Sequence, residues 1–410
     1  MAHEHDTPAK SEMLDNRIAR PDLWFYPGEK LGPDQIRVTL MGTGWGNMIR
    51  PNQKGASIYI EVGNGDTFVF DAGPGCGINY NVMQVPFSKM DKIFLTHLHT
   101  DHCSDLPWIY TFGPATDRFT PLQLFGPHNF QTRDKVENMI PGDIPNLHRF
   151  VEGLKSFTEW HTVSFETTLQ VGNGYEIEVH PLDYRQTPPV TFEPGVGESP
   201  DRPHPGIAYH KNGVTIRHWP ALHIIDGAIS YRLDWNGMSV VWSGDTQPNH
   251  YTVEHAKGVD LLIHETAPDV ARFVQAQQIS PQQAKTIIDY SHTPAKALGK
   301  ILKYTNPKLA VTCHCPVDPE EWAGLIGAVR TSWDGDYQIG EDLMVFTLSK
   351  STPKPTIRKG GIHERPWGVT LEQRHASDPR FRGQPLNVRD YRTPKIFAEK
   401  LNDEKSRGDS

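Results

Sequence analysis

The stretch FLTHLHTDHCSD, residues 94 to 105, places four potential metal ligands within six positions at the end of an apolar strand. His97, His99, Asp101 and His102 carry imidazole and carboxylate groups, which borderline metals such as zinc prefer. Alternation along an extended segment places His97 and His99 on one side, and the following turn can present Asp101 and His102 to a second ion. A polar turn after a buried strand is the simpler alternative, but the complete HxHxDH pattern favours a metal site.

The bulk composition predicts a globular protein without a broad nucleic-acid surface. The chain has 410 residues, 37% of them apolar, and a formal net charge of -8 at pH 7. This acidic balance disfavours wide contact with nucleic acid, which requires a strongly positive surface. The four cysteines are too few to staple a chain this long and indicate a reducing compartment. No apolar run is long enough for a signal peptide or a spanning helix, so we expect a soluble cytoplasmic protein with no membrane contact.

Hydrophobic patterning predicts strands in two batches, each followed by helices, which is typical of a layered α/β or α+β domain. The first strands are expected at 37–42, 56–73 (a hairpin), 90–97, 120–127 and 168–185 (a second hairpin), with a helix at 130–140. Later strands are expected at 214–223, 228–246, 259–265, 309–315 and 341–349. Helices are expected at 280–290, 293–305 and 320–332, and the first two open with a Ser-Pro or Thr-Pro start.

Composition divides the chain into three parts. Residues 1–35 are polar and broken by Pro and Gly, which predicts an irregular N-terminal extension, and residues 36–350 form the main domain. A less regular insertion at about 128–215 contains the Pro-rich stretch 186–206, which is too long for a plain connection and is expected to overhang the site. Residues 351–410 carry 13 Lys or Arg against 8 Asp or Glu. They are expected to form a C-terminal extension that is solvated or docks on a partner subunit.

The HxHxDH motif, followed by more ligand types at the ends of later strands, resembles the metallo-β-lactamase superfamily. That resemblance implies a four-layer αββα sandwich and two zinc ions per chain, with manganese or iron as alternatives. His223 in PALHIIDGAISYRL, Asp245 in SVVWSGDT and His314 in LAVTCHC occur in the order that the family requires. His218 is an alternative to His223, because only the distance to the following strand favours His223. By similarity, the first ion is held by His97, His99 and His223, the second by Asp101, His102 and His314, and Asp245 bridges them.

The motifs SGDT (243–246), LIHET (262–266) and SHT (291–293) resemble the ribonuclease Z and arylsulfatase-like branch. The openings LMGTGWG and FVFDAGPG resemble it as well. The branch implies ester hydrolysis by a metal-bound hydroxide that Asp101 orients or deprotonates. It also implies His292 as general acid for the leaving oxygen and Glu265 as the group that orients it. His264 is expected to be a buried structural histidine. Thr100 stands where ribonuclease Z usually has Gly, and the last motif reads HCPV, which weakens any transfer of substrate.

The expected substrate is a small anionic ester, either a phosphodiester such as a cyclic nucleotide or an aryl sulfate. A tRNA 3′-end endoribonuclease is the alternative, followed by a lactonase or other carbon-centred hydrolase and, least favoured, a non-catalytic metal-binding scaffold. Family tRNA enzymes usually carry a long arm between the third ligand and the bridging aspartate, but only 22 residues separate His223 from Asp245. Arg185, Arg202 and Tyr209 are expected to meet the substrate anion. The family resemblance also favours a homodimer.

Overall fold

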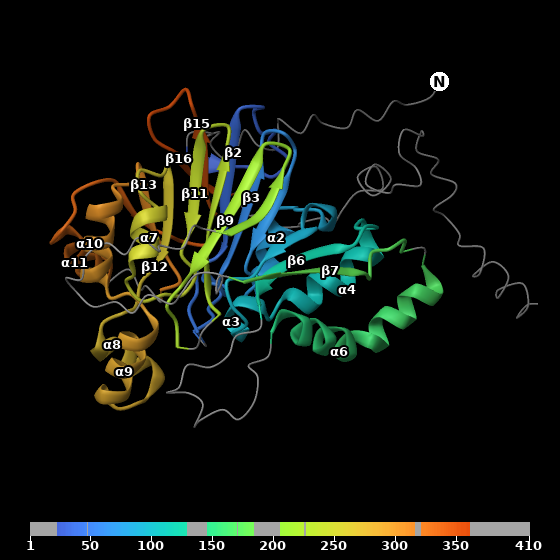
Figure 1. The fold of residues 1–410 in the computed structure, drawn as a ribbon, viewed down its shortest axis with the longest axis horizontal. Helices are drawn as coiled ribbons and strands as arrows, with labels where there is room; N and C mark the ends of the chain where they lie inside the picture. The colour runs from blue at the N-terminus through green and yellow to red at the C-terminus, as the bar shows by residue number, and fades with distance from the viewer. Residues whose placement is uncertain are drawn as a thin grey trace, which may run out of the picture.

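The protein folds into two β-sheets that lie face to face, with helices on both outer sides (Figure 1). The computed structural model describes residues 23–46, 48–128, 146–169, 171–183, 206–224, 227–315 and 321–360. The predicted four-layer αββα sandwich is confirmed. The helix expected at 130–140, most of the Pro-rich stretch and the chain beyond 360 lie outside these residues. Among the described helices, none is long and apolar enough to cross a membrane.

The first sheet has nine strands in the order β1-β16-β15-β2-β3-β4-β5-β6-β7. Their bounds are β1 Trp24–Phe25, β2 Gln35–Gly42, β3 Ser57–Val62, β4 Thr67–Phe70, β5 Lys92–Phe94, β6 Leu122–Pro127, β7 Ile177–Leu182, β15 Met344–Ser349 and β16 Thr356–Gly360. Strands β2, β3 and β4 pair antiparallel, whereas β4 to β7 pair in parallel. The carboxyl ends of the parallel strands therefore share one edge, and the HxHxDH motif follows β5 at that edge.

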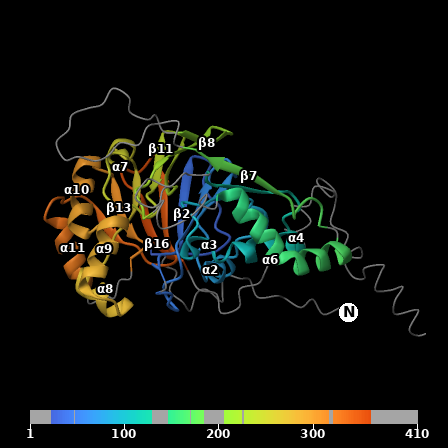
Figure 2. The same cartoon turned by 60° about the horizontal axis from the view of Figure 1, so that its bottom comes forward.

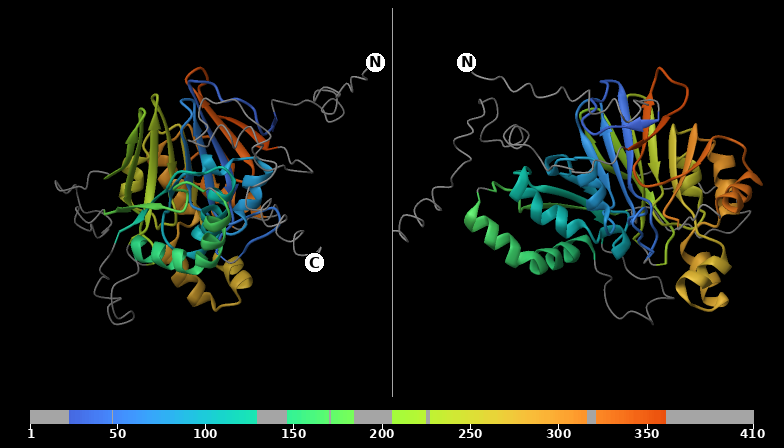
Figure 3. Two further views of the ribbon diagram at one scale, coloured as in Figure 1. Left: turned by 90° about the vertical axis from the view of Figure 1, so that its right-hand side faces the viewer. Right: turned by 180° about the vertical axis from the view of Figure 1, so that it is seen from behind.

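The second sheet has seven strands in the order β14-β13-β12-β11-β10-β9-β8. Their bounds are β8 Gly206–Lys211, β9 Val214–Pro220, β10 Ile229–Trp235, β11 Met238–Trp242, β12 Leu261–Glu265, β13 Leu309–Cys313 and β14 Tyr337–Ile339. Strands β11 to β14 are parallel, so their carboxyl ends also meet at one edge. The left view of Figure 3 shows the two sheets nearly edge-on, with β8 to β10 in yellow-green and the first sheet mainly in blue.

Helices cover the outer face of each sheet (Figure 2). Those on the first sheet are α2 Cys76–Val82, α3 Thr100–Cys103, α4 Leu106–Thr116 and α6 Leu147–Thr168, with a short 3-10 turn at Phe87–Lys89. Those on the second sheet are α7 His250–His255, α10 Ala295–Thr305 and α11 Trp322–Arg330. Helices α8 Val270–Gln277 and α9 Pro281–Ser291 form a pair that projects below the strand ends in Figure 1.

An aromatic cluster between the sheets fixes the strand that leads into the HxHxDH motif. Phe94 at the end of β5 stacks on Phe125 at 4.2 Å between ring centroids, and on Phe70 at 5.1 Å. Tyr231 reaches across from β10, and its hydroxyl donates a hydrogen bond of 2.7 Å to the Leu95 carbonyl. Burial of these rings supplies the main free energy for sheet packing. The same contacts hold the backbone in place two residues before His97.

Ser280 and Thr293 open the two predicted helices, but only the Ser280 hydroxyl caps its helix. Ser280 and Gln283 form a reciprocal capping box at α9, with Pro281 in the first turn, as the Ser-Pro pattern predicts. At α10 the N-cap residue is Pro294, and no side chain caps the helix. The Thr293 hydroxyl instead donates to the Thr246 carbonyl at 2.6 Å. Thr293 therefore ties the α9–α10 connection to the loop that carries Asp245.

Two predicted segment boundaries differ from the structure. The hairpin expected at 168–185 is wrong, because α6 runs to Thr168 and the single strand β7 that follows pairs in parallel with β6. The main domain also continues past residue 350, since β16 pairs antiparallel with β15 and parallel with β1. The change in composition near residue 350 therefore coincides with a turn between two strands of the sheet, and the sheet continues beyond it.

Candidate metal centre

The metal-ligand types expected from sequence meet at the edge where both sheets present their strand ends. His97, His99, Asp101 and His102 occupy the loop after β5 and the start of α3. The other three follow strands of the second sheet: His223 after β9, Asp245 after β11 and His314 after β13. Their donor atoms form two groups, His97–His99–His223 and Asp101–His102–Asp245–His314, with the atoms of each group within 4.8 Å of one another.

The first group consists of three imidazole nitrogens that face a common point. His99 Nδ1 lies 3.0 Å from His97 Nε2 and 3.2 Å from His223 Nε2. Asp245 Oδ2 completes the group at 3.8 Å from His97 Nε2 and 3.9 Å from His223 Nε2. His218, the alternative third ligand, belongs to neither donor group and sits in β9 with its ring against Gly206. The geometry therefore favours His223.

The second group is more deeply buried and contains two carboxylates. His102 Nε2 lies 3.1 Å from His314 Nε2, which in turn lies 3.2 Å from Asp101 Oδ2. Asp245 Oδ1 lies 3.3 Å from His102 Nε2. Asp245 thus turns one carboxylate oxygen toward each donor group, which is the arrangement that a bridging ligand requires.

The spacing and the unmet bonding capacity of these atoms fit divalent cations. Ligand atoms about 2.0–2.1 Å from a tetrahedral ion are separated by roughly 3.3 Å, and the contacts within each group scatter around that value. Asp245 Oδ1 and His314 Nδ1 are buried and lie 3.1 Å apart, but neither forms a well-aligned hydrogen bond among the described residues. A buried carboxylate oxygen without a donor is costly, and a cation held there would offset that cost.

The protonation of the histidines differs between the two groups, and in both it is compatible with bound metal ions. Burial lowers the pKa of His97 well below its ordinary value and that of His223 to about 4. Both imidazoles are therefore neutral and can offer a ring nitrogen to a metal ion. Burial also opposes protonation of His102, but Asp245, Asp71 and Asp101 together raise its pKa well above the ordinary value. These carboxylates give the second group a negative charge, which a metal ion bound at His102 Nε2 would balance in place of a proton.

Asp71 is a buried carboxylate that orients the ring of His102. Its oxygens accept hydrogen bonds from the Thr96 amide at 2.8 Å, the Thr96 hydroxyl at 3.0 Å and Trp242 Nε1 at 2.9 Å. His102 Nδ1 lies 3.0 Å from Asp71 Oδ2, so it is the donor and leaves Nε2 free for the site. Sequence reasoning did not assign Asp71 this role, although an aspartate directly after β4 in FVFDAG was the available signal.

Replacing Asp71 with asparagine is expected to lower metal affinity by about 10- to 100-fold, because a residue that orients a ligand is lost. Competition with a chromogenic chelator measures that affinity. Asp66→Asn is the matched control, since Asp66 is a half-buried carboxylate far from both donor groups whose side chain bonds, among the described residues, to the Asn64 and Asn212 side chains. Equal affinities for the two variants would contradict the role given to Asp71.

His292 and Glu265 form a buried pair beside the donor groups. His292 ends α9, and its Nδ1 lies 3.1 Å from Glu265 Oε1, which also accepts the Thr246 amide at 2.8 Å. Burial lowers the pKa of His292, but the Glu265 carboxylate outweighs it and raises that pKa above its ordinary value. His292 is therefore stabilised in its protonated form, next to His223 at 5.3 Å between ring centroids.

Comparison with known proteins shows which families the chain resembles. Residues 36–189 match the family described as Anti-Pycsar protein Apyc1. The chain is 29% identical over 319 residues to Ribonuclease Z of Mycolicibacterium gilvum, covering 75% of this chain and 94% of that protein. It is 28% identical over 322 residues to Ribonuclease Z of Mycobacterium bovis, covering 75% and 96%.

Two solved structures share the fold. The metallo-β-lactamase fold protein YhfI of Bacillus subtilis superposes with a TM-score of 0.51 at 16% identity, covering 77% of this chain and all of that one. The short form of human tRNase Z superposes with a TM-score of 0.50 at 17% identity, covering 75% and 98%. The chain therefore has the metallo-β-lactamase fold and is similar to ribonuclease Z proteins over three quarters of its length.

Two residues of the GTGWG motif support the site without being metal-ligand types. The Gly46 amide donates a hydrogen bond of 2.9 Å to Asp101 Oδ2. The Trp45 ring lies edge-on to His292 and His314, at centroid distances of 5.3 and 6.3 Å. Trp45 therefore separates this side of the site from the α8–α9 pair, where it packs on Phe273.

Tyr209, one of the three residues expected to meet the substrate, is not brought to the site. Tyr209 is 6% exposed and packs edge-on against Phe68 and Phe94 in the core between the sheets, so the expectation that it meets substrate is wrong. An irregularity between Ile207 and Tyr209 breaks the alternation of β8, so that Ile207 is exposed and Tyr209 turns inward. The Pro-rich stretch before β8 gave no sign of that. Arg185 and Arg202 lie outside the described residues.

Tyr209→Ala is expected to destabilise the protein by about 3 kcal/mol, the usual cost of deleting a buried aromatic ring, and to leave KM unchanged. Denaturant unfolding and steady-state kinetics measure the two effects. A large rise in KM with unchanged stability would restore the substrate role.

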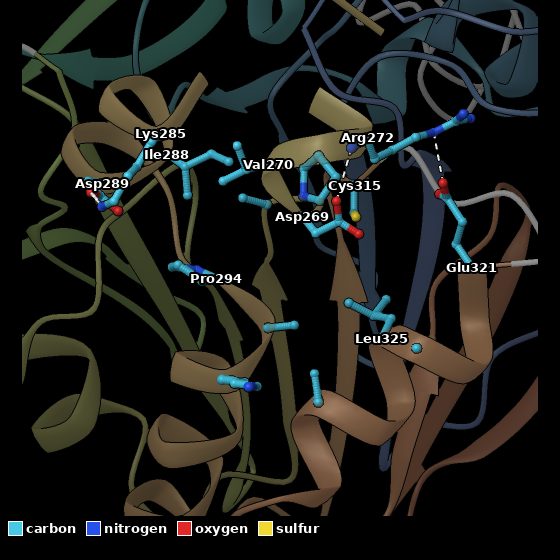
Figure 4. A pocket seen from close by; sticks show the side chains of 16 residues that line it. Asp269, Val270, Arg272, Lys285, Ile288, Asp289, Pro294, Cys315, Glu321 and Leu325 are labelled. Carbon is cyan, nitrogen blue, oxygen red and sulfur yellow. Dashed lines mark hydrogen bonds and ion pairs between the residues drawn. The ribbon is translucent and has the colours of Figure 1, made fainter. Parts of the chain in front are cut away.

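Three further side chains near the strand ends are buried and belong to neither donor group. His264 is buried in β12, with its Nδ1 2.7 Å from the Glu265 carbonyl, as expected of a structural histidine. Cys313 packs in the core between the sheets. Cys315 is buried as well, but it lines a cavity of about 520 Å³ between α8–α9 and α10–α11 (Figure 4). The positive φ of 51° at His314 ends the strand alternation that would have placed both thiols together.

Proposed function

We propose that the chain is a dinuclear zinc hydrolase that cleaves a small phosphodiester. The observation that carries this proposal is Asp245, which faces one donor group with Oδ2 and the other with Oδ1. A pair of ions bound there would lower the pKa of a shared water and polarise the ester oxygen. A cyclic nucleotide is the substrate type that we favour, with an aryl sulfate as the nearest alternative.

The chain's own residues supply proton handling and positioning. Asp101, held by the Gly46 amide, can orient the attacking water and accept its proton. His292 is stabilised in its protonated form and can donate a proton to the leaving oxygen. Glu265 holds the His292 ring through Nδ1, and the Thr246 amide holds Glu265. Burial of these groups excludes water and strengthens each interaction.

The chain between His223 and Asp245 supports a small substrate over tRNA. Strands β10 and β11 are joined directly at Asn236 and Gly237, whose positive φ values of 50° and 72° are typical of a tight hairpin turn. The described part of this segment therefore has no room for an RNA-gripping arm. The net charge of -8 points the same way.

Cleavage of a tRNA precursor is the second candidate, because the curated relatives reported above carry the name Ribonuclease Z. A lactonase would need the same donor groups but no phosphate recognition.

Activity of the zinc-loaded protein on parallel substrates tests the proposal. The panel contains bis(p-nitrophenyl) phosphate, cyclic nucleotides, an aryl sulfate, a lactone and a tRNA precursor. We expect kcat/KM for a phosphodiester to exceed that for the sulfate and the lactone by about 100-fold or more. Chelated protein serves as the inactive control. Efficient maturation of the tRNA precursor with weak small-diester activity would favour the second candidate and contradict ours.

A further inference from the structure

Asp342 is a buried carboxylate outside both donor groups that accepts four hydrogen bonds. It is 6% exposed and lies in the turn between β14 and β15. Its Oδ1 accepts the Thr43 amide at 2.9 Å and the Thr43 hydroxyl at 2.8 Å. Its Oδ2 accepts the Lys54 amide at 2.8 Å and Asn79 Nδ2 at 2.9 Å. A buried polar network with every member satisfied is rigid, so these bonds fix the segments that they join.

The topology brings Asp342 to the edge where the donor groups lie. Strand β14 is parallel to β13, so the turn after β14 lies at the same edge as His314, which follows β13. Strand β15 begins after that turn and pairs antiparallel with β2, whose last residue opens the GTGWG motif. Asp342 therefore reaches this motif from a position 299 residues after Thr43 in the chain.

The carboxylate joins two backbone segments that are already in close contact. The Gly44 amide donates a hydrogen bond of 2.6 Å to the Lys54 carbonyl. A Cβ atom at Gly44 would lie 2.6 Å from that same oxygen, so this approach requires glycine. With Oδ1 on Thr43 and Oδ2 on Lys54, Asp342 holds both sides of the contact.

The same motif carries a contact to the second donor group. Its last residue is Gly46, three positions after Thr43, and the Gly46 amide donates to Asp101 Oδ2 at 2.9 Å. The Thr43 carbonyl also accepts the Cys315 amide at 3.3 Å, so the motif is anchored at the end of β13 as well. Thr43 is thus held from two sides, and its position decides where the Gly46 amide points.

We propose that Asp342 is a positioning residue for Asp101. It touches neither the donor groups nor a substrate, and it acts through the GTGWG motif: fixing Thr43 fixes the Gly46 amide, which in turn sets the direction of Asp101 Oδ2. The inference rests on the dinuclear centre of the proposed function. Because Asp101 is proposed to hold the second ion and to orient the attacking water, loss of Asp342 should weaken binding of one ion and lower kcat. KM should stay close to that of the wild type.

Asp342→Asn keeps the shape of the side chain and breaks the network whichever way the new amide faces. All four neighbours of Asp342 donate hydrogen bonds. An amide nitrogen in place of Oδ1 would face the Thr43 N–H, and one in place of Oδ2 would face the Lys54 N–H. Either orientation leaves one backbone amide without an acceptor, so the motif must shift.

Competition of zinc with a chromogenic chelator tests the role without depending on any substrate. We expect Asp342→Asn to bind one of the two ions about 10- to 100-fold more weakly than the wild type and the other unchanged. The visible absorption spectrum of the cobalt-loaded variant should change as well. With bis(p-nitrophenyl) phosphate as substrate, kcat should fall while KM is retained.

Asp117→Asn is the matched control. Asp117 is also a buried aspartate that accepts a backbone amide and a hydroxyl, both from Ser88, and it belongs to neither donor group. Its variant should lose stability in denaturant unfolding and keep wild-type zinc affinity. Equal zinc affinity in Asp342→Asn and the wild type, or an equal loss in both variants, would overturn the proposal. A wild-type protein that binds no metal would instead contradict the proposed function itself, and the inference with it.

A double-mutant cycle with Asp101→Asn separates positioning from a general loss of stability. If Asp342 acts through Asp101, Asp342→Asn should change zinc affinity little in a chain that already carries Asp101→Asn. A change as large as in the wild-type background would show that the effect does not pass through Asp101, and would overturn the proposal.

Two milder substitutions at Thr43 test the same network if Asp342→Asn does not fold. Thr43→Val removes one of the four donors and keeps the shape of the side chain, so it should weaken the same ion by about three- to tenfold. Thr43→Ser retains the hydroxyl and should restore wild-type affinity. Equal affinities in the Val and Ser variants would overturn the role given to this network.

Discussion

Asp245→Ala is expected to reduce hydrolysis by about a thousandfold or more and to lower bound metal below two ions per chain. Its two oxygens face different donor groups, so a single substitution removes a ligand from both. His102 and His314 would also lose the carboxylate that lies 3.3 and 3.1 Å from their ring nitrogens. Metal content by mass spectrometry and kcat/KM on bis(p-nitrophenyl) phosphate measure the two effects.

Asp289→Ala provides the control for that experiment. Asp289 is an exposed aspartate on α9 that pairs with Lys285, away from both donor groups. It should keep full metal content and a rate close to that of the wild type. If the Asp245→Ala protein retained two ions and most of the activity, the bridging role would be contradicted.

His292→Gln is expected to lower kcat by about 100- to 10,000-fold on a substrate with a poor leaving group, which is the usual contribution of a general acid. Metal content should remain unchanged, because His292 is proposed as an acid and not as a ligand. The loss should be much smaller on bis(p-nitrophenyl) phosphate, whose leaving group departs readily without a proton. Rates on both substrates, measured with the same metal-loaded protein, test the assignment.

Glu265→Gln is a companion variant that separates positioning from acid catalysis. The amide still reaches His292 Nδ1 but no longer carries the charge that raises the His292 pKa. We expect a smaller loss of kcat than for His292→Gln, with the same dependence on leaving group. An equal loss on both substrates for either variant would indicate damage to metal binding instead.

The meeting of these side chains at one edge could be predicted, because most of them follow a strand that the sequence pattern identifies without help from distant residues. The apolar runs that form β5, β11 and β13 end directly before polar residues, and parallel pairing brings their carboxyl ends to one edge. The order of motifs then supplied His223, whose approach to His97 and His99 depends on a loop after β9. From spacing alone, His218 was equally acceptable; the structure places it within β9, facing Gly206.

Sequence patterns could not predict the features that depend on packing between segments far apart in the chain. Asp71 supports the site through Trp242 and His102, which are 171 and 31 residues away in the chain. Tyr209 resembles a surface residue beside a Pro-rich stretch, yet the rings of Phe68 and Phe94 bury it. Helix α6 was missed because the exposed Trp160 and Phe157 obscure the amphipathic period that marks a surface helix.

Anomalous diffraction from crystals of the purified, untreated protein tests the metal centre most directly. We predict two peaks at the absorption edge of a transition metal, one among His97, His99 and His223 and the other among Asp101, His102 and His314. Asp245 should lie between the peaks and contact both. The absence of anomalous signal at these side chains, with Asp245 hydrogen-bonded to protein donors alone, would contradict the assignment.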